Sequence, residues 1–306
     1  MKAIRLFQFD EAPFMDELAR PEPAVDEIVL RVEAAALNPL DVLVMTGAAR
    51  HFFDIALPMT LGTDIAGTVE RVGSAVVRWK AGDRVIAWTD AGRSGGLAGY
   101  AAVPAACCVV LPDGLSAVEG SAIPTAGITA WHALFSSARL QAGETVLIHA
   151  AAGGVGAFAV QFAHLAGARV IATASGDGVA LAQDLGADTV IDYRTQDFTT
   201  IAANVDVVLD LVGGDTQARS YATMRPGGRL VSTVMTPDAG QAAACGVTAE
   251  IFYAKPFADR LGELVATIAD GKVRVVIDRE VPIDRFNDAW ARQTSGRARG
   301  KIVIRP

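Results

Sequence analysis

The sequence predicts an α/β protein of two domains: a doubly wound parallel sheet in the middle of the chain, and a β-rich domain formed by the two ends. Strands and helices alternate from about residue 121 onward, which favours a parallel sheet covered on both faces. A glycine-rich turn at residues 151–156 joins a predicted strand to a predicted helix. Both ends consist of short β-like runs. We therefore expect one domain from residues 1–120 and 271–306, and the other from residues 121–270.

Length and charge narrow the possible functions. The 306 residues are enough for two compact domains, and a hydrophobic fraction of 51% suits a buried sheet covered by helices. A net charge of −7 makes nucleic acid and anionic membrane surfaces poor partners. No apolar stretch approaches the ~20 residues that a membrane span needs. The chain opens on a predicted strand, so we expect a cytoplasmic protein. The three cysteines predict neither disulfides nor a Cys-x-x-Cys pair.

The two ends of the chain predict a barrel-like or sandwich-like domain, because short strands follow one another without long helical patterns. The strands expected in the first part cover residues 2–7, 27–35, 67–72, 84–87 and 100–103. In the tail we expect strands at residues 273–277 and 301–304, joined by a helix around residues 283–293. The tail resembles the first part in consisting of short β-like runs, so we expect it to complete the same domain.

The middle of the chain predicts repeated strand–helix–strand units. The expected strands cover residues 144–150, 170–174, 189–193, 205–212, 229–234 and 247–252. The expected helices cover residues 154–167, 179–186, 216–224 and 256–270. Such an alternation requires a parallel sheet with helices on both faces.

The turn at residues 151–156, Ala-Ala-Gly-Gly-Val-Gly, is typical of a dinucleotide site. A glycine-rich turn before a helix exposes backbone N–H groups where the helix dipole favours a pyrophosphate. Gly153 lets the backbone approach the phosphates, and Gly156 lets the helix pack closely against the sheet. Ala151 breaks the strict G-x-G-x-x-G pattern, and a purely structural turn is the alternative. The surrounding strand–helix alternation favours the cofactor site.

The end of the second strand of this domain indicates NADPH, with NADH the less favoured alternative. NAD-binding proteins of this type place an acidic residue about 20 residues beyond the turn, on the ribose 2′-hydroxyl. The strand here ends at Ser175, whose hydroxyl can accommodate a 2′-phosphate. Tyr193 and Arg194, after the third strand, could close over that phosphate. Asp177, two residues beyond Ser175, is an acidic residue near this strand end and leaves NADH as the alternative cofactor.

Several segments resemble the zinc-independent quinone oxidoreductase branch of the medium-chain dehydrogenase/reductases, over essentially the whole chain. They are residues 36–41 (Ala-Leu-Asn-Pro-Leu-Asp), 61–69 (Leu-Gly-Thr-Asp-Ile-Ala-Gly-Thr-Val), 81–85 (Ala-Gly-Asp-Arg-Val), 125–131 (Thr-Ala-Gly-Ile-Thr-Ala-Trp), 151–156, 185–188 (Leu-Gly-Ala-Asp) and 295–303 (Ser-Gly-Arg-Ala-Arg-Gly-Lys-Ile-Val). In such proteins alanine is usual at the first position of the turn. The resemblance implies a GroES-like catalytic domain from the two ends and a Rossmann domain between them.

The resemblance also implies NADPH-dependent reduction of quinones or α,β-unsaturated carbonyls, usually by a homodimer. The residues it places on the pyrophosphate are Ala152, Gly153, Gly154 and Val155. Ser175 and Tyr193 would flank the 2′-phosphate. On the nicotinamide side we expect Thr129, Val212, Thr233 and Phe252, and Lys301 would reach the cofactor from the tail. The family commonly has a lysine just after the second strand; residues 176–178 here are Gly-Asp-Gly, a departure that predicts a weaker preference for NADP.

No metal is expected. Zinc alcohol dehydrogenases of the superfamily take catalytic ligands from a Cys, a His-Glu pair and another Cys or Asp. The corresponding places here hold Asn38, then Thr63 with Asp64, and Thr125. Zinc needs three or four thiolate, imidazole or carboxylate ligands to converge, and neither Cys nor His stands at any of these places.

Two residues are candidates for the chemistry. Asn38 can donate its amide to the substrate oxygen that gains negative charge during hydride transfer, although an asparagine before Pro39 can also serve only the turn. His51 could donate a proton, although a lone histidine in a loop is more often solvent-exposed. Thr129 abuts the nicotinamide or else faces the core of its helix.

Other activities fit the sequence less well. Enoyl-thioester reduction and cofactor binding without turnover are the alternatives to the reductase. Residues 92–96, Gly-Arg-Ser-Gly-Gly, match the nucleophile-elbow pattern of hydrolases. An elbow needs a strand before it and a helix after it, whereas β-like sequence or loop follows here, so we expect no hydrolase.

Overall fold

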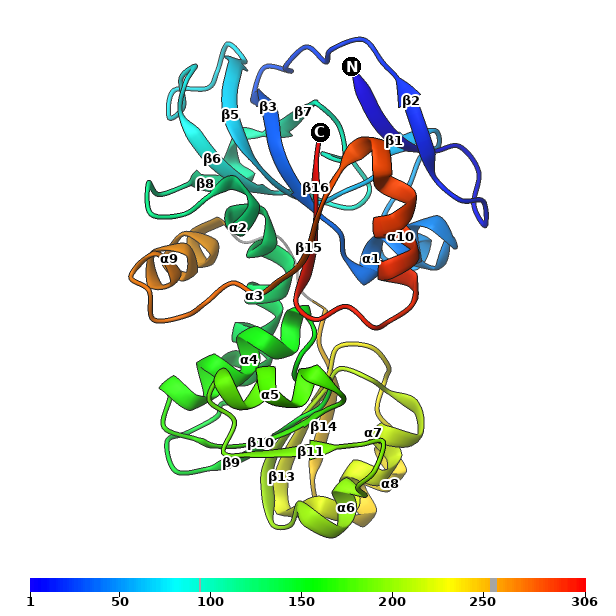
Figure 1. Cartoon of the computed structure of the whole chain (residues 1–306), viewed down its shortest axis with the longest axis vertical. Helices are drawn as coiled ribbons and strands as arrows, with labels where there is room; N and C mark the ends of the chain where they lie inside the picture. The colour runs from blue at the N-terminus through cyan, green and yellow to red at the C-terminus, as the bar shows by residue number, and fades with distance from the viewer. Residues whose placement is uncertain (94, 254–257) are drawn as a thin grey trace. The chain divides into compact units, whose positions relative to one another are not determined.

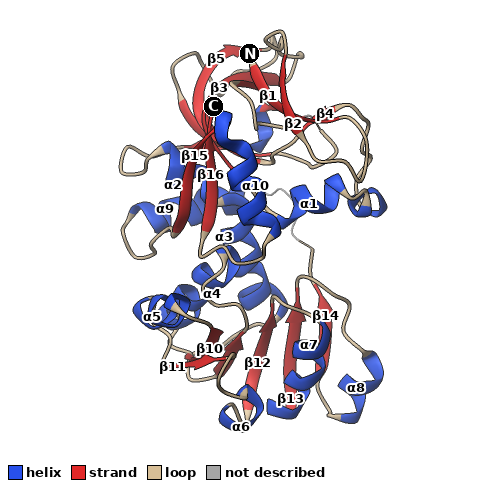
Figure 2. Cartoon of the chain, turned by 45° about the vertical axis from the view of Figure 1, so that its right-hand side comes forward, coloured by secondary structure: helices blue, strands red, loops and turns tan. Residues whose placement is uncertain are grey.

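The computed structural model describes residues 1–93, 95–253 and 258–306. The chain divides into two compact units, unit 1 (Met1–Thr125 with Lys255–Pro306) and unit 2 (Ala126–Ala254). Figure 1 traces the chain through both units, and Figure 2 shows their helices and strands in different colours.

Unit 2 is built on a six-stranded parallel sheet in the order β11-β10-β9-β12-β13-β14. Its strands are β9 (Thr145–Ile148), β10 (Arg169–Ala174), β11 (Thr189–Asp192), β12 (Val205–Asp210), β13 (Met224–Ser232) and β14 (Thr248–Ile251). Numbered within the unit, this order is 3-2-1-4-5-6, which is the doubly wound arrangement of dinucleotide-binding folds. The expected Rossmann domain is thereby confirmed.

Helices connect these strands in turn: α4 (Gly154–Leu165), α5 (Asp177–Asp184), α6 (Phe198–Ile201), α7 (Gly214–Ser220) and α8 (Ala239–Ala244). Because the strand order turns back between β11 and β12, right-handed crossovers put the helices before and after that point on opposite faces. In Figure 1, α4 and α5 lie on one side of the sheet, and α7 and α8 on the other.

Unit 1 contains two sheets that are almost wholly antiparallel. The larger has the order β15-β16-β3-β5-β6-β8, with β7 also paired to β3, and the smaller has the order β2-β1-β4. The strands are β1 (Lys2–Leu6), β2 (Phe14–Glu17), β3 (Glu27–Ala36), β4 (Met59–Thr60), β5 (Asp64–Val72), β6 (Arg84–Trp88), β7 (Tyr100–Pro104), β8 (Cys108–Val110), β15 (Ile277–Pro282) and β16 (Lys301–Arg305). Among the strand pairings of unit 1 that the described residues form, β15 with β16 is the parallel one. This is the expected GroES-like β-rich domain.

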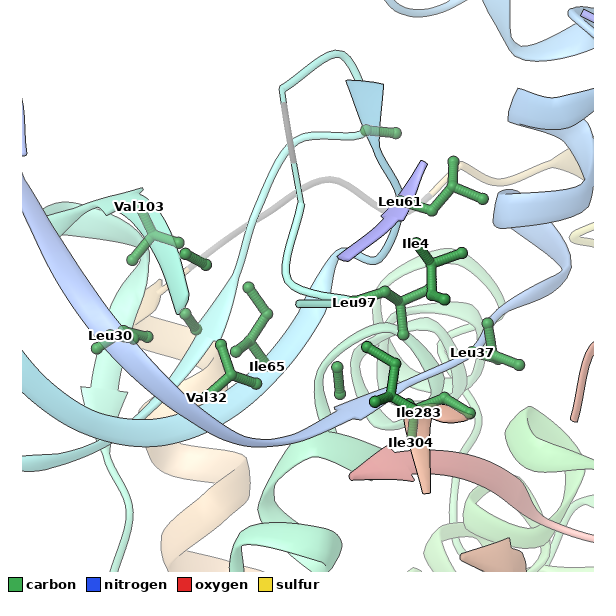
Figure 3. Close-up of a cluster of buried hydrophobic side chains, with 14 of the residues drawn as sticks. Ile4, Leu30, Val32, Leu37, Leu61, Ile65, Leu97, Val103, Ile283 and Ile304 are labelled. Atoms are coloured by element: carbon green, nitrogen blue, oxygen red, sulfur yellow. The ribbon is translucent and has the colours of Figure 1, made fainter. Parts of the chain in front are cut away.

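The tail of the chain returns to unit 1, as the sequence predicts. Strand β16 pairs with β3, where Ile304 lies opposite Ala35. Ile4, Leu37 and Ile304, from three distant parts of the sequence, share one apolar core (Figure 3). Their burial in one cluster shows that the two ends of the chain share a single core.

The helices of unit 1 are short and lie between or after its strands. They are α1 (Pro39–Met45), α2 (Ala117–Ala122), α9 (Ala258–Ala269) and α10 (Phe286–Thr294), with 3₁₀ turns at Ala48–His51, Ala105–Cys107 and Ile283–Arg285. Helix α3 (Pro124–Trp131) begins in the last residues of the first part of unit 1, and a π-helical turn follows it at His132–Ser137.

Two expectations differ from the structure. The helix expected at residues 256–270 falls in unit 1 instead of the inserted domain, and its described part, α9, contacts β8. Residues 256 and 257 lie outside the described part of the chain. The strand expected at residues 273–277 begins instead at Ile277 and continues through the charged residues 278–280. It is an edge strand, and edge strands tolerate charged side chains because only one side is paired.

Candidate functional site

The turn after β9 leaves the N-terminus of helix α4 open. Gly153 is the N-cap residue and has extended backbone angles, and no side chain caps the first turn of the helix. The backbone N–H groups of a helix's first turn have no partner inside the helix, and with the helix dipole they favour an anion. The turn lies at the carboxyl end of β9, next to the point where the strand order turns back, which is where such sheets bind their ligands.

Two glycines of this turn have different roles. A Cβ at Gly156 would lie 2.3 Å from the carbonyl oxygen of Ala150 and 2.7 Å from the Cα of Ala151, so only glycine lets the helix approach the strand end this closely. A Cβ at Gly153 would meet nothing nearer than the Ala150 oxygen at 3.2 Å. Gly156 therefore serves the packing, as the sequence predicts. Gly153 leaves the space above the helix N-terminus free.

The hydroxyl groups of Ser175 and Tyr193 meet beside this turn. Ser175 follows β10, Tyr193 follows β11, and the serine Oγ donates to the tyrosine Oη at 3.0 Å. Ser175 is half-buried and Tyr193 exposed. Asp177 is exposed at the start of α5, two residues beyond Ser175. The tip of β10 itself carries hydroxyls and no carboxylate.

A buried carboxylate orders the loops after β12 and β13. Asp210, the last residue of β12, is completely buried and accepts four hydrogen bonds. The donors are the N–H groups of Val212 (3.0 Å) and Gly213 (2.8 Å), Nε2 of Gln217 (2.8 Å) and Oγ of Ser232 (2.9 Å). Ser232 Oγ in turn accepts from the N–H groups of residues 234 and 235. One carboxylate thus fixes two adjacent loops at the carboxyl edge of the sheet.

The residues expected on the nicotinamide side are carried by elements of unit 2. Val212 is exposed in the loop that Asp210 orders, and Thr233 follows β13 and donates its N–H to the Asp210 carbonyl at 3.1 Å. Phe252 follows β14, and its ring stacks on His132 with centroids 5.5 Å apart. Thr129 is buried in α3. Val212, Thr233 and Phe252 follow three adjacent strands, β12, β13 and β14, at the same edge of the sheet. Their contact with a cofactor stays a prediction.

A buried histidine supports the strand end below the turn. His149 lies between Thr173 Oγ1 at 3.0 Å and Ser220 Oγ at 2.9 Å. Ser220 donates its own proton to the Thr216 carbonyl, so it accepts from Nε2–H of the imidazole, and Nδ1 accepts from Thr173. Burial lowers the pKa of His149 to about 4, which keeps the ring neutral. His149 is a structural residue of the core.

In unit 1, Asn38 and Lys301 form a buried polar pair. Lys301 Nζ donates to Asn38 Oδ1 and to the Leu37 carbonyl oxygen at 2.9 Å, and it lies 3.8 Å from a carboxylate oxygen of Asp64. Burial lowers the pKa of Lys301, and the nearby carboxylates raise it. The other end of the asparagine amide, Nδ2, is buried without a hydrogen-bond partner. The tail thus places its lysine on the predicted catalytic asparagine.

Two carboxylates fix the backbone around this pair. Asp64 accepts from Oγ1 of Thr125 at 2.6 Å and from its N–H at 3.1 Å. Asp41 accepts from the N–H groups of Asn38 (2.7 Å) and Gly62 (3.1 Å). Burial raises the pKa of Asp41 to about 6, because the charged form loses its hydration.

His51, the second predicted catalytic residue, ends the 3₁₀ turn Ala48–His51 and is exposed. Ser94, the central residue of the nucleophile-elbow pattern, lies outside the described residues. The segment that follows it leads into β7 and not into a helix, which speaks against an elbow.

Comparison with known proteins bears on both units. A family model described as "Alcohol dehydrogenase GroES-like domain" matches residues 24–113, and one described as "Zinc-binding dehydrogenase" matches residues 185–304. The chain is 34% identical over 304 residues to the chloroplast envelope quinone oxidoreductase homolog of Arabidopsis thaliana, covering 94% of this chain and 92% of that protein. The chain belongs to the quinone oxidoreductases of the medium-chain dehydrogenase/reductase superfamily.

Two further superfamily members resemble the whole chain. The NADPH-dependent alkenal/one oxidoreductase of A. thaliana is 33% identical over 298 residues, which cover 94% of this chain and 74% of that protein. The structure of the Escherichia coli quinone oxidoreductase complexed with NADPH superposes with a TM-score of 0.88 at 27% identity, covering all of both chains. The chain is therefore an oxidoreductase with a nicotinamide cofactor, and the family inferred from its motifs is confirmed.

Across residues 1–93, 95–253 and 258–306, no three His, Cys, Asp or Glu side chains are grouped so as to hold a metal ion. In the same ranges, no helix is long and apolar enough to cross a membrane.

Three residues that order the loops after β12 and β13 have no role in the sequence analysis: Asp210, Ser232 and Gln217. The available signal is an aspartate near the end of a predicted buried strand, since such a carboxylate must find donors in the loop that follows.

Proposed function

We propose that the protein reduces quinones or α,β-unsaturated carbonyls with NADPH, by hydride transfer without zinc. The observation that carries the proposal is the open N-terminus of α4 beside the hydroxyl pair of Ser175 and Tyr193. The helix end offers free N–H groups to a pyrophosphate. The hydroxyl pair offers uncharged polar groups where an NAD-specific site places a carboxylate.

The residues that would hold the dinucleotide all come from the carboxyl edge of the unit 2 sheet. Ala152, Gly153, Gly154 and Val155 would face the pyrophosphate, Ser175 and Tyr193 the 2′-phosphate, and Val212, Thr233 and Phe252 the nicotinamide. Bound NADPH supplies a hydride to the acceptor. The protein's part is to orient the reactants and to stabilise the negative charge that develops on the acceptor oxygen. Asn38 has the free amide donor for that oxygen.

The polar groups of unit 1 do not suit zinc. Asn38 Oδ1 is taken by the Lys301 ammonium, which also lies 3.8 Å from Asp64. A buried ammonium repels a divalent cation at the same oxygens, and zinc binds cysteine, histidine and carboxylate side chains in threes or fours. The places that the resemblance aligns with the zinc ligands thus include two members of a lysine-centred network, Asn38 and Asp64, which supports chemistry without a metal.

The test measures oxidation of NADPH and of NADH separately, with a panel of quinones and enones. Turnover with NADPH exceeding turnover with NADH is expected. Binding of NADPH without oxidation by any acceptor would indicate a cofactor-binding protein without catalytic activity. Activity confined to enoyl thioesters would indicate that these, and not quinones or enones, are the substrates.

A charged variant tests the cofactor site itself. Gly153→Asp should abolish dinucleotide binding, because its carboxylate occupies the pyrophosphate position. It should fold, since a Cβ at residue 153 would meet only the Ala150 oxygen, at 3.2 Å, and aspartate is a favourable N-cap residue. The matched control is Gly114→Asp, which adds the same charge at an exposed glycine of unit 1, where φ is not positive and a Cβ meets nothing nearer than 4.0 Å. Equal affinities in both variants would contradict the assignment.

Two further expectations are part of the proposal: a homodimer, to be checked by light scattering coupled to size-exclusion chromatography, and a cytoplasmic location.

A further inference from the structure

The amide nitrogen of Asn38 is an unusual group in this fold. The residue is 2% exposed, and Nδ2 has no hydrogen-bond partner. Leaving a buried donor unpaired is unfavourable, and most buried polar groups in native proteins are paired. The Asn38 amide therefore carries a donor that no group of the protein uses.

The chemistry of Lys301 decides which end of the Asn38 carboxamide faces it. The ammonium of Lys301 is a donor only, so the atom of Asn38 that faces it must be the carbonyl oxygen Oδ1. An amide nitrogen in that place would put two donors against each other. Lys301 thus forces Nδ2 to point the opposite way, and its positive charge on Oδ1 makes the amide a stronger donor.

Lys301 is itself held in place. Its Nζ also donates to the Leu37 carbonyl, and Asp64 lies 3.8 Å away. Asp64 is completely buried and is fixed by both donors of Thr125. The ammonium is therefore anchored by oxygens of separate chain segments, and a side-chain rotation of Asn38 would break its hydrogen bond to Lys301.

We propose that Lys301 is a positioning residue that orients the Asn38 carboxamide so that its free amide N–H meets the acceptor oxygen of the substrate. The inference rests on the proposed function, and it gives Lys301 a different role from the cofactor contact expected from the sequence. A lysine that served stability alone would account for the ion pair with Asp64. It would not account for a neighbouring amide left with an unpaired donor.

The test separates an effect through Asn38 from a loss of folding. Lys301→Met alone would leave the Asp64 carboxylate buried without its cation. It is therefore combined with Asp64→Asn, so that the double substitution removes both charges. The double substitution is made with Asn38 present and again in the Asn38→Ala background. The kcat for a quinone and the dissociation constant of NADPH are measured for all four proteins.

With Asn38 present, the double substitution should lower kcat about tenfold. In the Asn38→Ala background it should lower kcat less than about twofold, because the amide that Lys301 orients is already gone. The affinity for NADPH should stay within about twofold in all four proteins. Equal losses of kcat in both backgrounds would overturn the positioning role while leaving the reductase proposal intact.

The isosteric variant Asn38→Asp gives a second measurement that does not depend on removing Lys301. Its carboxylate keeps the lysine partner and the side-chain shape but has no amide donor, so kcat should fall about 100-fold with little change in KM for NADPH. Unchanged kcat would overturn the inference. A wild-type protein that reduces neither quinones nor enones would overturn the proposed function and this inference with it.

Discussion

The hydroxyl groups of Ser175 and Tyr193 lie 3.0 Å apart, although 18 residues separate them in the chain. They meet because β10 and β11 are parallel neighbours whose carboxyl ends lie at the same edge of the sheet. Under the proposed function, the pair stands where an acidic residue would select the free ribose of NADH.

The first prediction follows from this pair. Ser175→Asp puts a carboxylate beside the expected 2′-phosphate, which repels it, while the same carboxylate can accept a hydrogen bond from the 2′-hydroxyl of NADH. The ratio of kcat/KM for NADPH to that for NADH should fall at least ~10-fold, which corresponds to about 1.4 kcal/mol. Tyr193→Phe, which loses one hydroxyl and adds no charge, should change the ratio much less. An unchanged ratio in Ser175→Asp would place the 2′-phosphate elsewhere.

The second prediction concerns the packing of α4. Gly156→Ala forces a Cβ to within 2.3 Å of the Ala150 oxygen, so backbone must move, and we expect a loss of about 2–3 kcal/mol in the free energy of unfolding. Gly153→Ala, whose Cβ meets only one atom at 3.2 Å, should change stability by less than about 1 kcal/mol. Urea denaturation of both variants provides the comparison. Equal stabilities would mean that the helix can shift away without cost.

The third prediction concerns Asp210. Asp210→Asn puts amide hydrogens against some of its four donors, so the two loops that it fixes should loosen. We expect the KM for NADPH to rise about tenfold, while 2′-phospho-ADP-ribose, which lacks the nicotinamide, should bind within about twofold of wild type. Asp206→Asn, near the opposite end of β12, is the control, since Asp206 binds Thr145 and Arg225 away from the loops. Equal losses for both ligands would contradict a role confined to the nicotinamide side.

The fourth prediction is a pH dependence of stability. The pKa of His149 is about 4 in the folded protein and about 6.5 when unfolded, so between these values the unfolded chain binds more protons. The stabilisation is complete above pH 6.5 and is lost as the pH falls toward 4, by about 3 kcal/mol in total. The raised pKa of Asp41 acts in the opposite direction at similar pH.

The measurement therefore compares wild type with His149→Gln, in which Asp41 still titrates and cancels in the difference. The wild-type advantage in free energy of unfolding should shrink from pH 8 to pH 5. A difference that is independent of pH would show that the imidazole can take up its proton inside the fold.

The parallel sheet of unit 2 was predictable strand by strand. Apolar runs such as the one at residues 170–174 and the glycines of the turn are local signals that depend on few distant contacts. The tail was predictable only in outline. The apolar run at residues 273–277 is a good strand by propensity, but the pairing with β16 fixed the strand at Ile277–Pro282.

The sequence by itself determined the fold class, the family, the dinucleotide turn and Asn38 as a candidate donor, because local pattern and motif spacing record them. Only the tertiary structure decided how Asn38 is used. Lys301 lies more than 260 residues after Asn38 in the chain, and no local sequence pattern predicts that an ammonium from the tail contacts this amide. That contact exists because β16 pairs with β3, which ends just before Asn38, and a buried ammonium must find oxygen acceptors.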